Sequence, residues 1–220
     1  MHSAYFITGT DTDVGKTWAT LSLMHAIKQQ GKSVIGMKPV AAGCELLANG
    51  SLRNADALLL QTHSSVLVDY ALINPYAYQL PLSPHLAGAT NPVNLSFVQQ
   101  RFKQLQDLAQ VVLVEGAGGW YSPVNATQAN SDLAQQLGLP IILVVGIKLG
   151  CINHARLSYQ AISSSGLHCS GWIAVCIDES TLRNDDIIKT IQKQLTSPLL
   201  GILPYDKNAD FAGFARYLNL

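Results

Sequence analysis

Short apolar runs alternate with helix-length segments along the chain of 220 residues, and this alternation restricts the possible fold more than any other feature. The apolar runs hold Val, Ile and Leu at consecutive positions, which is typical of strands covered on both faces. Several helical segments end at a glycine, as at Gly31, Gly138 and Gly166. The pattern predicts an α/β fold in which a single doubly wound, mostly parallel sheet carries helices on both faces.

The predicted elements can be placed by residue number, and together they form one domain, 1–220. We expect strands at 5–8, 33–38, 111–115, 141–145, 172–177 and 199–203. We expect helices at 16–30, 55–62, 95–109, 131–137, 152–165 and 185–195. The stretch 65–92 is rich in Pro and Tyr and has the least regular pattern, so we expect it to form loops on the substrate side.

The composition excludes several classes of partner. Fourteen Lys and Arg residues balance fourteen Asp and Glu residues, so no basic excess points to a nucleic acid. The amino terminus lacks the features of a signal peptide, and the most continuous apolar run, 140–147, is too short to cross a bilayer. The cysteines form no C-x-x-C pair and the histidines no i, i+4 pair, which argues against a zinc site. We therefore expect a soluble cytoplasmic protein without nucleic-acid or membrane partners.

The segment GTDTDVGKT, residues 9–17, joins the first predicted strand to the first predicted helix. The N–H groups of such a glycine-bearing loop and the positive end of the following helix form a cradle for phosphates. Lys16 would then reach the β- and γ-phosphates, and the Thr17 hydroxyl would bind Mg²⁺. The loop departs from the pattern G-x-x-x-x-G-K-[ST], because Thr10 replaces the first glycine and Gly9 lies one residue earlier. Its position between a strand and a helix nevertheless predicts a P-loop NTPase type of fold that binds a nucleoside triphosphate, rather than a chance turn.

Three further side chains could do chemistry, and each also has a simpler structural explanation. Glu115 ends a buried strand before a glycine loop, where a carboxylate can bind Mg²⁺, cap a helix or face solvent. Lys38 ends the second strand and could neutralise charge during phosphoryl transfer, but it could equally be a surface lysine. Asp56 lies in the first turn of a predicted helix, where stabilising that helix end is a sufficient reason for an acid.

Taken together, the segments GTDTDVGKT, KPVAAG, LRNADAL, LSPH, VEGAGGWYSPV and VGIKLGCINHARL closely resemble dethiobiotin synthetases, in order and with similar spacing. The resemblance runs through nearly the whole chain. It implies a homodimeric, Mg-ATP-dependent ligase of biotin biosynthesis that joins CO₂ to 7,8-diaminononanoate (7,8-diaminopelargonate) and closes the ring of dethiobiotin. It also implies that one amine forms a carbamate, that ATP phosphorylates this carbamate, and that the second amine attacks the mixed anhydride and expels phosphate.

The resemblance implies a role for each matching position. Lys16 and Lys38 would stabilise the carbamate and the transferring phosphoryl group, with Lys38 as the catalytic lysine. The implied Mg²⁺ ligands are Thr17, Asp56 and Glu115. The implied substrate-binding residues are Ala42 and, from the partner subunit, Gly150, Cys151, Ile152 and Asn153, which open a predicted helix. The implied nucleotide contacts are Asp13, Val14, Gly15, Lys16, Thr17, Trp18, Asp56, Glu115, Gly116, Ala117, Gly118, Val175, Cys176, Pro204, Tyr205 and Asp206, of which the last three border adenine.

Two positions depart from the family pattern. Ala42 stands where related sequences have Ser or Thr, and a missing hydroxyl bond would cost roughly 0.5–1.5 kcal/mol if nothing replaces it. Val175 stands where an Asn typically reads adenine, and valine cannot form hydrogen bonds with a base. We therefore predict weakened discrimination among ATP, GTP and CTP.

Two other classes of protein use this type of loop. Corrin amidases and the accessory domains of phosphotransacetylases usually carry a further catalytic domain, for which this chain has no room. Nucleotide switches of the partitioning type place a lysine just after the first glycine of the loop, where this chain has Thr10. These differences favour the ligase interpretation.

Overall fold

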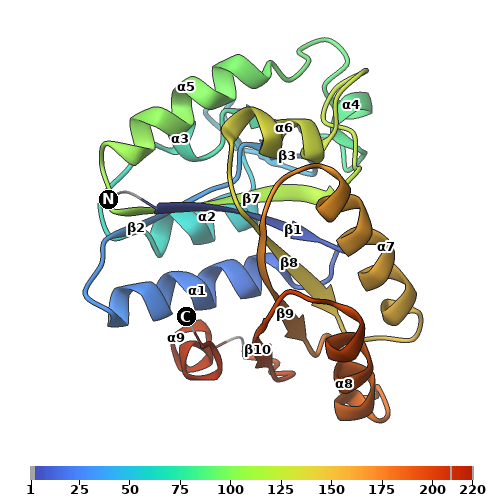
Figure 1. Cartoon of the computed structure of the whole chain (residues 1–220). Coiled ribbons are helices and arrows are strands. Elements are labelled where there is room, and N and C mark those ends of the chain that lie inside the picture. The colour runs from blue at the N-terminus through green and yellow to red at the C-terminus, as the bar shows by residue number, and fades with distance from the viewer. Residues whose placement is uncertain (1–2, 209, 220) are drawn as a thin grey trace.

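The computed structural model describes residues 3–208 and 210–219 and is built around a six-stranded sheet (Figure 1). The strand order is β10-β9-β8-β1-β7-β2, and every adjacent pair is parallel. The strands are β1 (Ser3–Gly9), β2 (Val34–Met37), β7 (Val111–Gly119), β8 (Ile141–Gly146), β9 (Cys169–Val175) and β10 (Leu199–Leu203). The predicted α/β fold with a parallel, doubly wound sheet is therefore confirmed.

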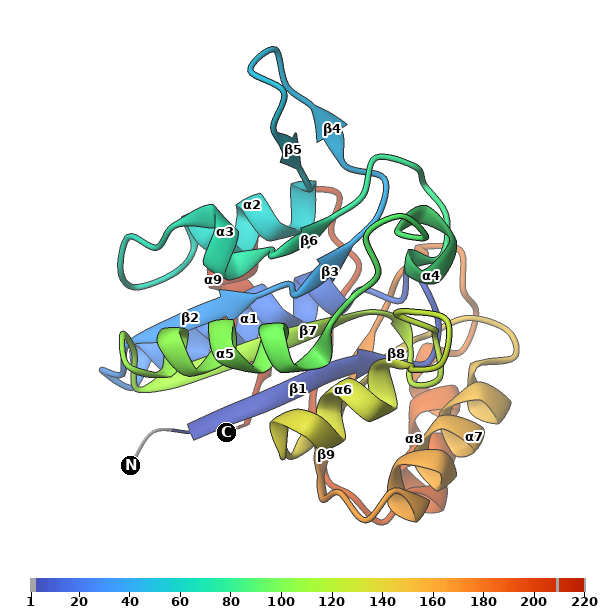
Figure 2. The same ribbon diagram turned by 90° about the horizontal axis from the view of Figure 1, so that it is seen from above.

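Helices cover both faces of this sheet (Figures 1 and 2). One face carries α1 (Lys16–Gln29) and α9 (Phe211–Phe214). The other carries α5 (Leu95–Gln106), α6 (Asn130–Leu137), α7 (Cys151–Ser164) and α8 (Asn184–Gln194). Successive residues of β1 enter different cores, since Phe6 packs in one and Ile7 in the other, both fully buried. This double burial explains why the strands are apolar at consecutive positions.

The element boundaries differ from the sequence prediction at a few ends. β7 continues to Gly119, so the glycine segment after Glu115 is strand rather than loop, and Gly119 pairs with Gly9 after a shift of register. β9 ends at Val175, two residues earlier than predicted, and α5 ends at Gln106, three residues earlier. The glycines expected at helix ends all have positive φ: 76° at 31, 66° at 138 and 80° at 166.

The stretch between β2 and α5 contains short elements that the sequence pattern did not predict. They are β3 (Val40–Ala41), β4 (Glu45–Leu46), β5 (Leu52–Arg53), α3 (Tyr70–Ile73), β6 (Tyr76–Ala77) and α4 (Pro84–Ala87). The β4–β5 hairpin projects from the body of the molecule (Figure 2). The predicted α2 (Ala55–Thr62) follows the hairpin and packs beside β2. A short 3₁₀ helix, Ala215–Tyr217, follows α9.

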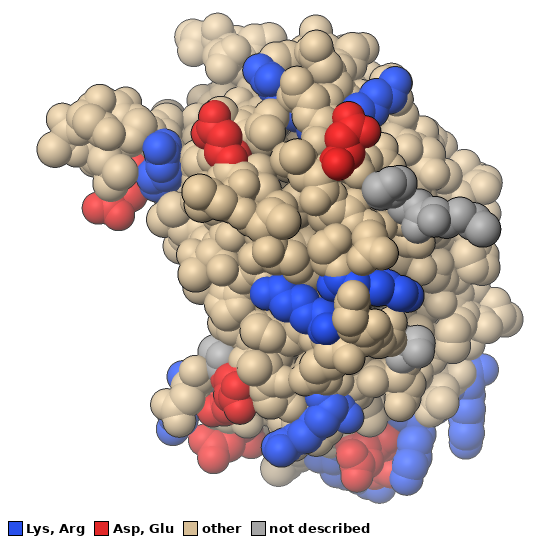
Figure 3. Space-filling view, turned by 90° about the vertical axis from the view of Figure 1, so that its left-hand side faces the viewer, with Lys and Arg blue, Asp and Glu red and all other residues tan. Residues whose placement is uncertain are grey.

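Charged residues make up 13% of the chain. On the face drawn in Figure 3, basic and acidic side chains both occur and are separated by large uncharged areas. Within residues 3–208 and 210–219, no helix combines the length and apolar character needed to cross a membrane.

Candidate active site

The loop between β1 and α1 has a backbone that only certain residues allow. Gly15 is the N-cap of α1 with φ of 87°, and a Cβ built on it would lie 2.6 Å from Cγ1 of Val175. Both the left-handed conformation and this close approach require glycine. Lys16 follows directly and folds back over the loop, where its Nζ donates to the backbone oxygen of Asp11 at 2.8 Å. The sequence Gly-Lys-Thr is therefore needed for the shape of the loop as well as for its chemistry.

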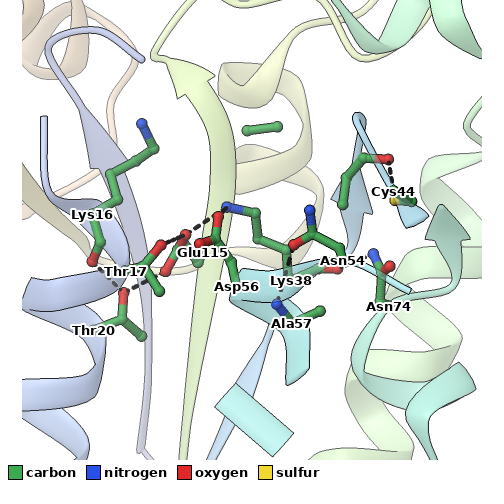
Figure 4. Close-up of polar contacts among 12 residues, drawn as sticks. Lys16, Thr17, Thr20, Lys38, Cys44, Asn54, Asp56, Ala57, Asn74 and Glu115 are labelled. Atoms are coloured by element: carbon green, nitrogen blue, oxygen red, sulfur yellow. Dashed lines mark hydrogen bonds and ion pairs between the residues drawn. The ribbon is translucent and has the colours of Figure 1, made fainter. Parts of the chain in front are cut away.

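Glu115 is the centre of a buried polar cluster at the carboxyl ends of β1, β2 and β7 (Figure 4). The carboxylate is fully buried and accepts three hydrogen bonds. Its Oε1 accepts from the Thr17 hydroxyl at 2.9 Å and from Nζ of Lys38 at 2.5 Å, and its Oε2 accepts from the Thr20 hydroxyl at 2.8 Å. A carboxylate can be buried only when it is paired and hydrogen-bonded in this way. Glu115 is therefore neither a helix cap nor a solvent-facing acid.

Lys38 lies directly after β2, and its ammonium bridges two carboxylates. Nζ is 2.5 Å from Oε1 of Glu115 and 2.9 Å from Oδ2 of Asp56, while only 6% of the residue is exposed. Burial alone would lower the pKa of Lys38, but the two carboxylates outweigh burial and raise it. Burial would also raise the pKa of Asp56, but the neighbouring Lys38 lowers it. Lys38 is thus a permanently charged, buried cation rather than a surface lysine.

Lys16 has the opposite electrostatic environment. It is 7% exposed, and burial together with the charge of Lys38 lowers its pKa to about 8. The two lysines therefore differ in kind, because Lys38 keeps its proton at any physiological pH whereas Lys16 is close to losing it. Unlike Lys38, Lys16 has no carboxylate within ion-pair distance in the described part of the chain, so an anion such as a phosphate would stabilise its charged form.

These residues line a pocket of about 880 Å³. Of the positions predicted from sequence, it brings together Asp13, Gly15, Lys16, Thr17, Trp18, Lys38, Ala42, Asp56, Glu115, Ala117 and Gly118. The irregular stretch before α5 supplies the opposite wall with residues 81–84. The lining combines Lys16, Lys38, Asp56 and Glu115 with small or apolar residues such as Ala41, Ala42 and Leu82.

The match to known proteins extends over the whole chain. A family model described as "AAA domain" matches residues 3–212. The ATP-dependent dethiobiotin synthetase BioD of Xanthomonas axonopodis pv. citri (strain 306) is 47% identical over 221 residues, with 100% of this chain and 98% of the relative covered. The chain belongs to the dethiobiotin synthetase family. The ATP-dependent dethiobiotin synthetase BioD 1 of Escherichia coli (strain K12) is 44% identical over 223 residues, which cover 100% of this chain and 99% of the relative.

A solved structure outside the dethiobiotin synthetase family shows the same fold. The septum site-determining protein MinD of Pyrococcus horikoshii OT3, complexed with Mg-ADP, matches with a TM-score of 0.57 at 16% identity. The match covers 97% of this chain and 86% of that one. At this identity the likeness concerns the fold alone.

In this member of the dethiobiotin synthetase family, several predicted nucleotide contacts lie outside the pocket lining. Val14 is fully buried inside the loop, and Gly116 packs against the ring of Phe6. Val175 is also fully buried, directly beneath Gly15, so its side chain supports the loop. The remaining predicted contacts are Cys176, which is buried, and Pro204, Tyr205 and Asp206, which are half-buried beyond β10.

The predicted substrate segment 150–153 lies apart from the pocket. Gly150 is the N-cap of α7 with φ of 91°, and the helix begins at Cys151, one residue earlier than predicted. None of the four residues lines the pocket of its own chain. This placement is compatible with the expected contribution to the site of a partner subunit, which stays a prediction.

Two residues that support the site were missed by the sequence analysis. Thr20 is fully buried and donates to Glu115, and its distance of three residues from Thr17 on the same helix face could have indicated this role. Asn130 opens α6, and its Nδ2 donates to the backbone oxygens of Ala117 at 2.6 Å and Gly119 at 2.8 Å. No local pattern indicates the contact of Asn130, because the residues lie more than ten positions apart.

The donor set at Glu115 fits a shared magnesium ion better than a metal held by protein alone. Thr17, Asp56 and Glu115 offer only oxygen ligands, which Mg²⁺ prefers. Among the residues that the structure describes, no group of three or more His, Cys, Asp or Glu side chains could hold a metal. Two carboxylates and a hydroxyl are the protein contribution expected when phosphate oxygens and water complete the coordination.

Proposed function

We propose that the protein is a Mg-ATP-dependent dethiobiotin synthase of biotin biosynthesis. It would convert 7,8-diaminononanoate, CO₂ and ATP into dethiobiotin, ADP and phosphate. The observation that carries the proposal is the ion-paired cluster of buried Lys38 and Glu115 with the partly exposed Asp56, beside the phosphate loop, in a chain that matches dethiobiotin synthetases over its full length. Within the cluster, Lys38 supplies a positive charge that Glu115 and Asp56 hold in place, where a phosphoryl group would be transferred.

The proposed reaction needs charge stabilisation and positioning rather than a protein nucleophile. One amine of the diamine adds to CO₂, loses a proton and becomes a carbamate. A carbamate oxygen attacks the γ-phosphorus of ATP, ADP leaves, and a carbamic-phosphoric anhydride forms. The second amine then attacks the carbonyl carbon and loses a proton, phosphate leaves, and the ring closes. Lys38 would neutralise the carbamate, and Lys16 the phosphoryl oxygens, because both ammonium groups are buried beside the pocket.

We propose that Thr17, Asp56 and Glu115 hold the Mg²⁺ of Mg-ATP. When bound, the ion would neutralise charge on the β- and γ-phosphate oxygens. The Thr17 hydroxyl and both carboxylates already lie within one hydrogen-bonded group, with Lys38 as its cation (Figure 4). This arrangement supports the donor set but requires Lys38 to share its carboxylates with the ion.

We also propose a cytoplasmic homodimer in which one domain, 1–220, forms each protomer. The site would be completed across the interface by residues 150–153 of the partner, whose N–H groups at the start of α7 would receive the substrate carboxylate. Gly150 is the N-cap of α7, and residues 150–153 do not line the pocket of their own chain, which leaves the start of this helix available for that role.

The release of ADP tests the proposed function against a nucleotide switch. We expect ADP to form only when Mg-ATP, bicarbonate and 7,8-diaminononanoate are all present, and neither DNA nor lipid vesicles should replace the diamine. The loop supports this expectation, because Thr10 stands where partitioning switches carry a lysine. ADP release that responds to DNA or vesicles and ignores the diamine would overturn the proposal.

A further inference from the structure

Tyr70 and Asn74 form a buried polar pair behind the contact between Lys38 and Asp56. Tyr70 begins α3 and is 8% exposed, while Asn74 is the C-cap of the same helix and is 4% exposed. The Tyr70 hydroxyl donates to Oδ1 of Asn74 at 2.9 Å. Neither residue lines the pocket, so neither can touch a ligand there.

The carboxyl end of α3 holds the backbone of Lys38 on both sides. Nδ2 of Asn74 donates to the carbonyl oxygen of Lys38 at 2.7 Å, and the N–H of Lys38 donates to the carbonyl oxygen of Ile73 at 2.9 Å. Lys38 lies just beyond β2 and therefore has no sheet partner of its own. Asn74 is labelled beside Lys38 in Figure 4. The backbone position from which the Lys38 side chain starts is thus set by α3.

The same pair also fixes the start of the helix that carries Asp56. The Tyr70 hydroxyl accepts from the backbone N–H of Asn54 at 2.8 Å. Asn54 is the N-cap of α2, and its side chain accepts from the N–H of Ala57 at 3.1 Å. Asp56 lies two residues after this cap. One hydroxyl group therefore connects the anchor of Lys38 to the anchor of Asp56.

Every hydrogen-bond donor of the two side chains is used. The hydroxyl of Tyr70 uses its donor and one acceptor, and the amide of Asn74 makes bonds at both its nitrogen and its oxygen, with a further bond from Nδ2 to the Tyr76 oxygen at 3.2 Å. The guanidinium of Arg53 lies over the Tyr70 ring, 4.2 Å from its centroid. A buried polar network of this kind gives a unique geometry, which an apolar pair would not specify.

We propose that Tyr70 and Asn74 are positioning residues that place Lys38 and Asp56 at the separation the reaction needs. The pair acts through the backbone groups of Lys38 and Asn54. As a result, the ammonium of Lys38 and the carboxylate of Asp56 lie 2.9 Å apart. The inference rests on the proposed function for its kinetic consequence, but its structural consequence, the contact between Lys38 and Asp56, does not depend on that function.

Tyr70→Phe is the direct test, because it removes the hydroxyl and keeps the ring under Arg53. Tyr76→Phe is a matched control. The Tyr76 hydroxyl is also buried and accepts from the N–H of an asparagine N-cap, Asn94, at 3.0 Å, but that cap begins α5, away from the site. Both variants take the acceptor from the backbone N–H of an N-cap residue, and Tyr70→Phe also removes the bond to Asn74, so Tyr70→Phe should lower the denaturation midpoint more than Tyr76→Phe.

The kinetic readout separates positioning from general stability. We expect Tyr70→Phe to lower kcat about tenfold while the Kd for ATP without diamine stays within about twofold, because misplacement affects the reacting geometry more than binding. Tyr76→Phe should retain kcat within about twofold. Asn74→Asp, which keeps the acceptor for Tyr70 and removes the donor to Lys38, should repeat the effect if Tyr70→Phe does not fold. Equal kcat values in wild type, Tyr70→Phe and Asn74→Asp would overturn the proposal.

A second readout does not depend on the reaction. In ¹⁵N-labelled protein, the Lys38 ammonium should exchange its protons slowly, with its signal assigned by Lys38→Arg. We expect exchange about tenfold faster in Tyr70→Phe and unchanged in Tyr76→Phe, because the ion pairs of Lys38 protect those protons. If wild type lacks diamine-dependent turnover but this contrast holds, the proposed function fails and the positioning role stands. If turnover is present and exchange in Tyr70→Phe equals wild type, the positioning role fails.

Discussion

The two ends of the proposed nucleotide site differ in how many polar contacts hold their side chains. The phosphate end comprises Lys16, Thr17, Lys38, Asp56 and Glu115, and each of these side chains has a hydrogen-bonded or ionic partner. The base end predicted from the sequence comprises Val175, Cys176 and the half-buried segment 204–206, which do not line the pocket. There Val175 supports the loop from below, and the Cys176 sulfur accepts only a long contact of 3.7 Å from Asn184.

The side chains at the phosphate end are already held in position by polar contacts before a ligand binds, whereas those predicted for the base end have few such contacts. Fixed dipoles and charges are most effective where charge develops during a reaction, and they cost little reorganisation when they are already in place. Base recognition requires hydrogen bonds to the base edge, and valine provides none. We infer that the polar contacts of the site serve phosphoryl transfer, and that the protein discriminates only weakly among nucleotide bases.

The largest expected effect is the loss of the phosphate-end lysines. Lys38→Ala and Lys16→Ala should each lower turnover by about 10³-fold or more, because each removes a buried positive charge beside the transferring group. Circular dichroism should show that the fold is retained. Lys103→Ala, which removes an exposed lysine on α5, is the control and should be as active as wild type. Near-normal turnover in either site variant would show that its lysine is misassigned.

The pH dependence of ATP binding tests the contrast between the two lysines. The pKa of Lys16 in the free protein is lowered to about 8, so Lys16 is charged at pH 7 and mostly neutral at pH 9. The Kd for ATP should therefore rise about tenfold between these values, if binding requires the charged form. Lys16→Arg should bind ATP with little change over this range, because arginine stays charged. Calorimetry at several pH values measures this, and a flat wild-type profile would contradict it.

Thr20→Val should produce a smaller effect at the phosphate end. The substitution leaves Oε2 of the buried Glu115 without its donor, which should lower the free energy of unfolding by about 1–3 kcal/mol. The Mg²⁺ concentration needed for half-maximal activity should rise several-fold, roughly in line with a bond of this strength. Thr190→Val is the matched control: its hydroxyl bonds the backbone four residues earlier, as that of Thr20 does, but reaches no carboxylate. If Thr20→Val and Thr190→Val had the same free energy of unfolding and the same Mg²⁺ requirement, Thr20 would have no role in supporting Glu115.

The smallest expected difference concerns the base. The values of kcat/KM for ATP, GTP and CTP should lie within about a hundredfold of one another, corresponding to less than about 3 kcal/mol of discrimination. Thr20→Val should lower all three values by a similar factor, because it acts only at the phosphate end. A preference of wild type for ATP above about a hundredfold would show that other groups at the base end read adenine.

The sequence predicted the sheet well because its strands are buried on both faces. All six strands and the long helices were located, since consecutive apolar residues such as Phe6 and Ile7 leave little ambiguity. The glycine segment after Glu115 was taken for a loop because glycine is rare in strands, yet close packing against β1 requires small residues there. Local pattern could not show that neighbouring strands impose this constraint.

The site was predicted less evenly than the fold. Lys16 and Thr17 were identified by their position between a strand and a helix, and Glu115 by a predicted strand end, although β7 continues four residues beyond it to Gly119. Tyr70 and Asn74 gave no signal, because their partners Asn54 and Lys38 are 16 and 36 residues away along the chain. The burial of Val175 under Gly15 depends on how two strands are placed in the sheet. Spacing along the chain therefore identified the groups that bind, but not those that hold them in place.

Incorporation of labelled bicarbonate into acid-stable product tests the central claim most directly. The reaction would contain Mg-ATP and be run with and without 7,8-diaminononanoate, with Lys38→Ala as the inactive control. We predict incorporation that requires both the diamine and ATP, with one ADP released for each carbon fixed. If the protein binds ATP but incorporates no labelled carbon when the diamine is present, it is not a dethiobiotin synthase.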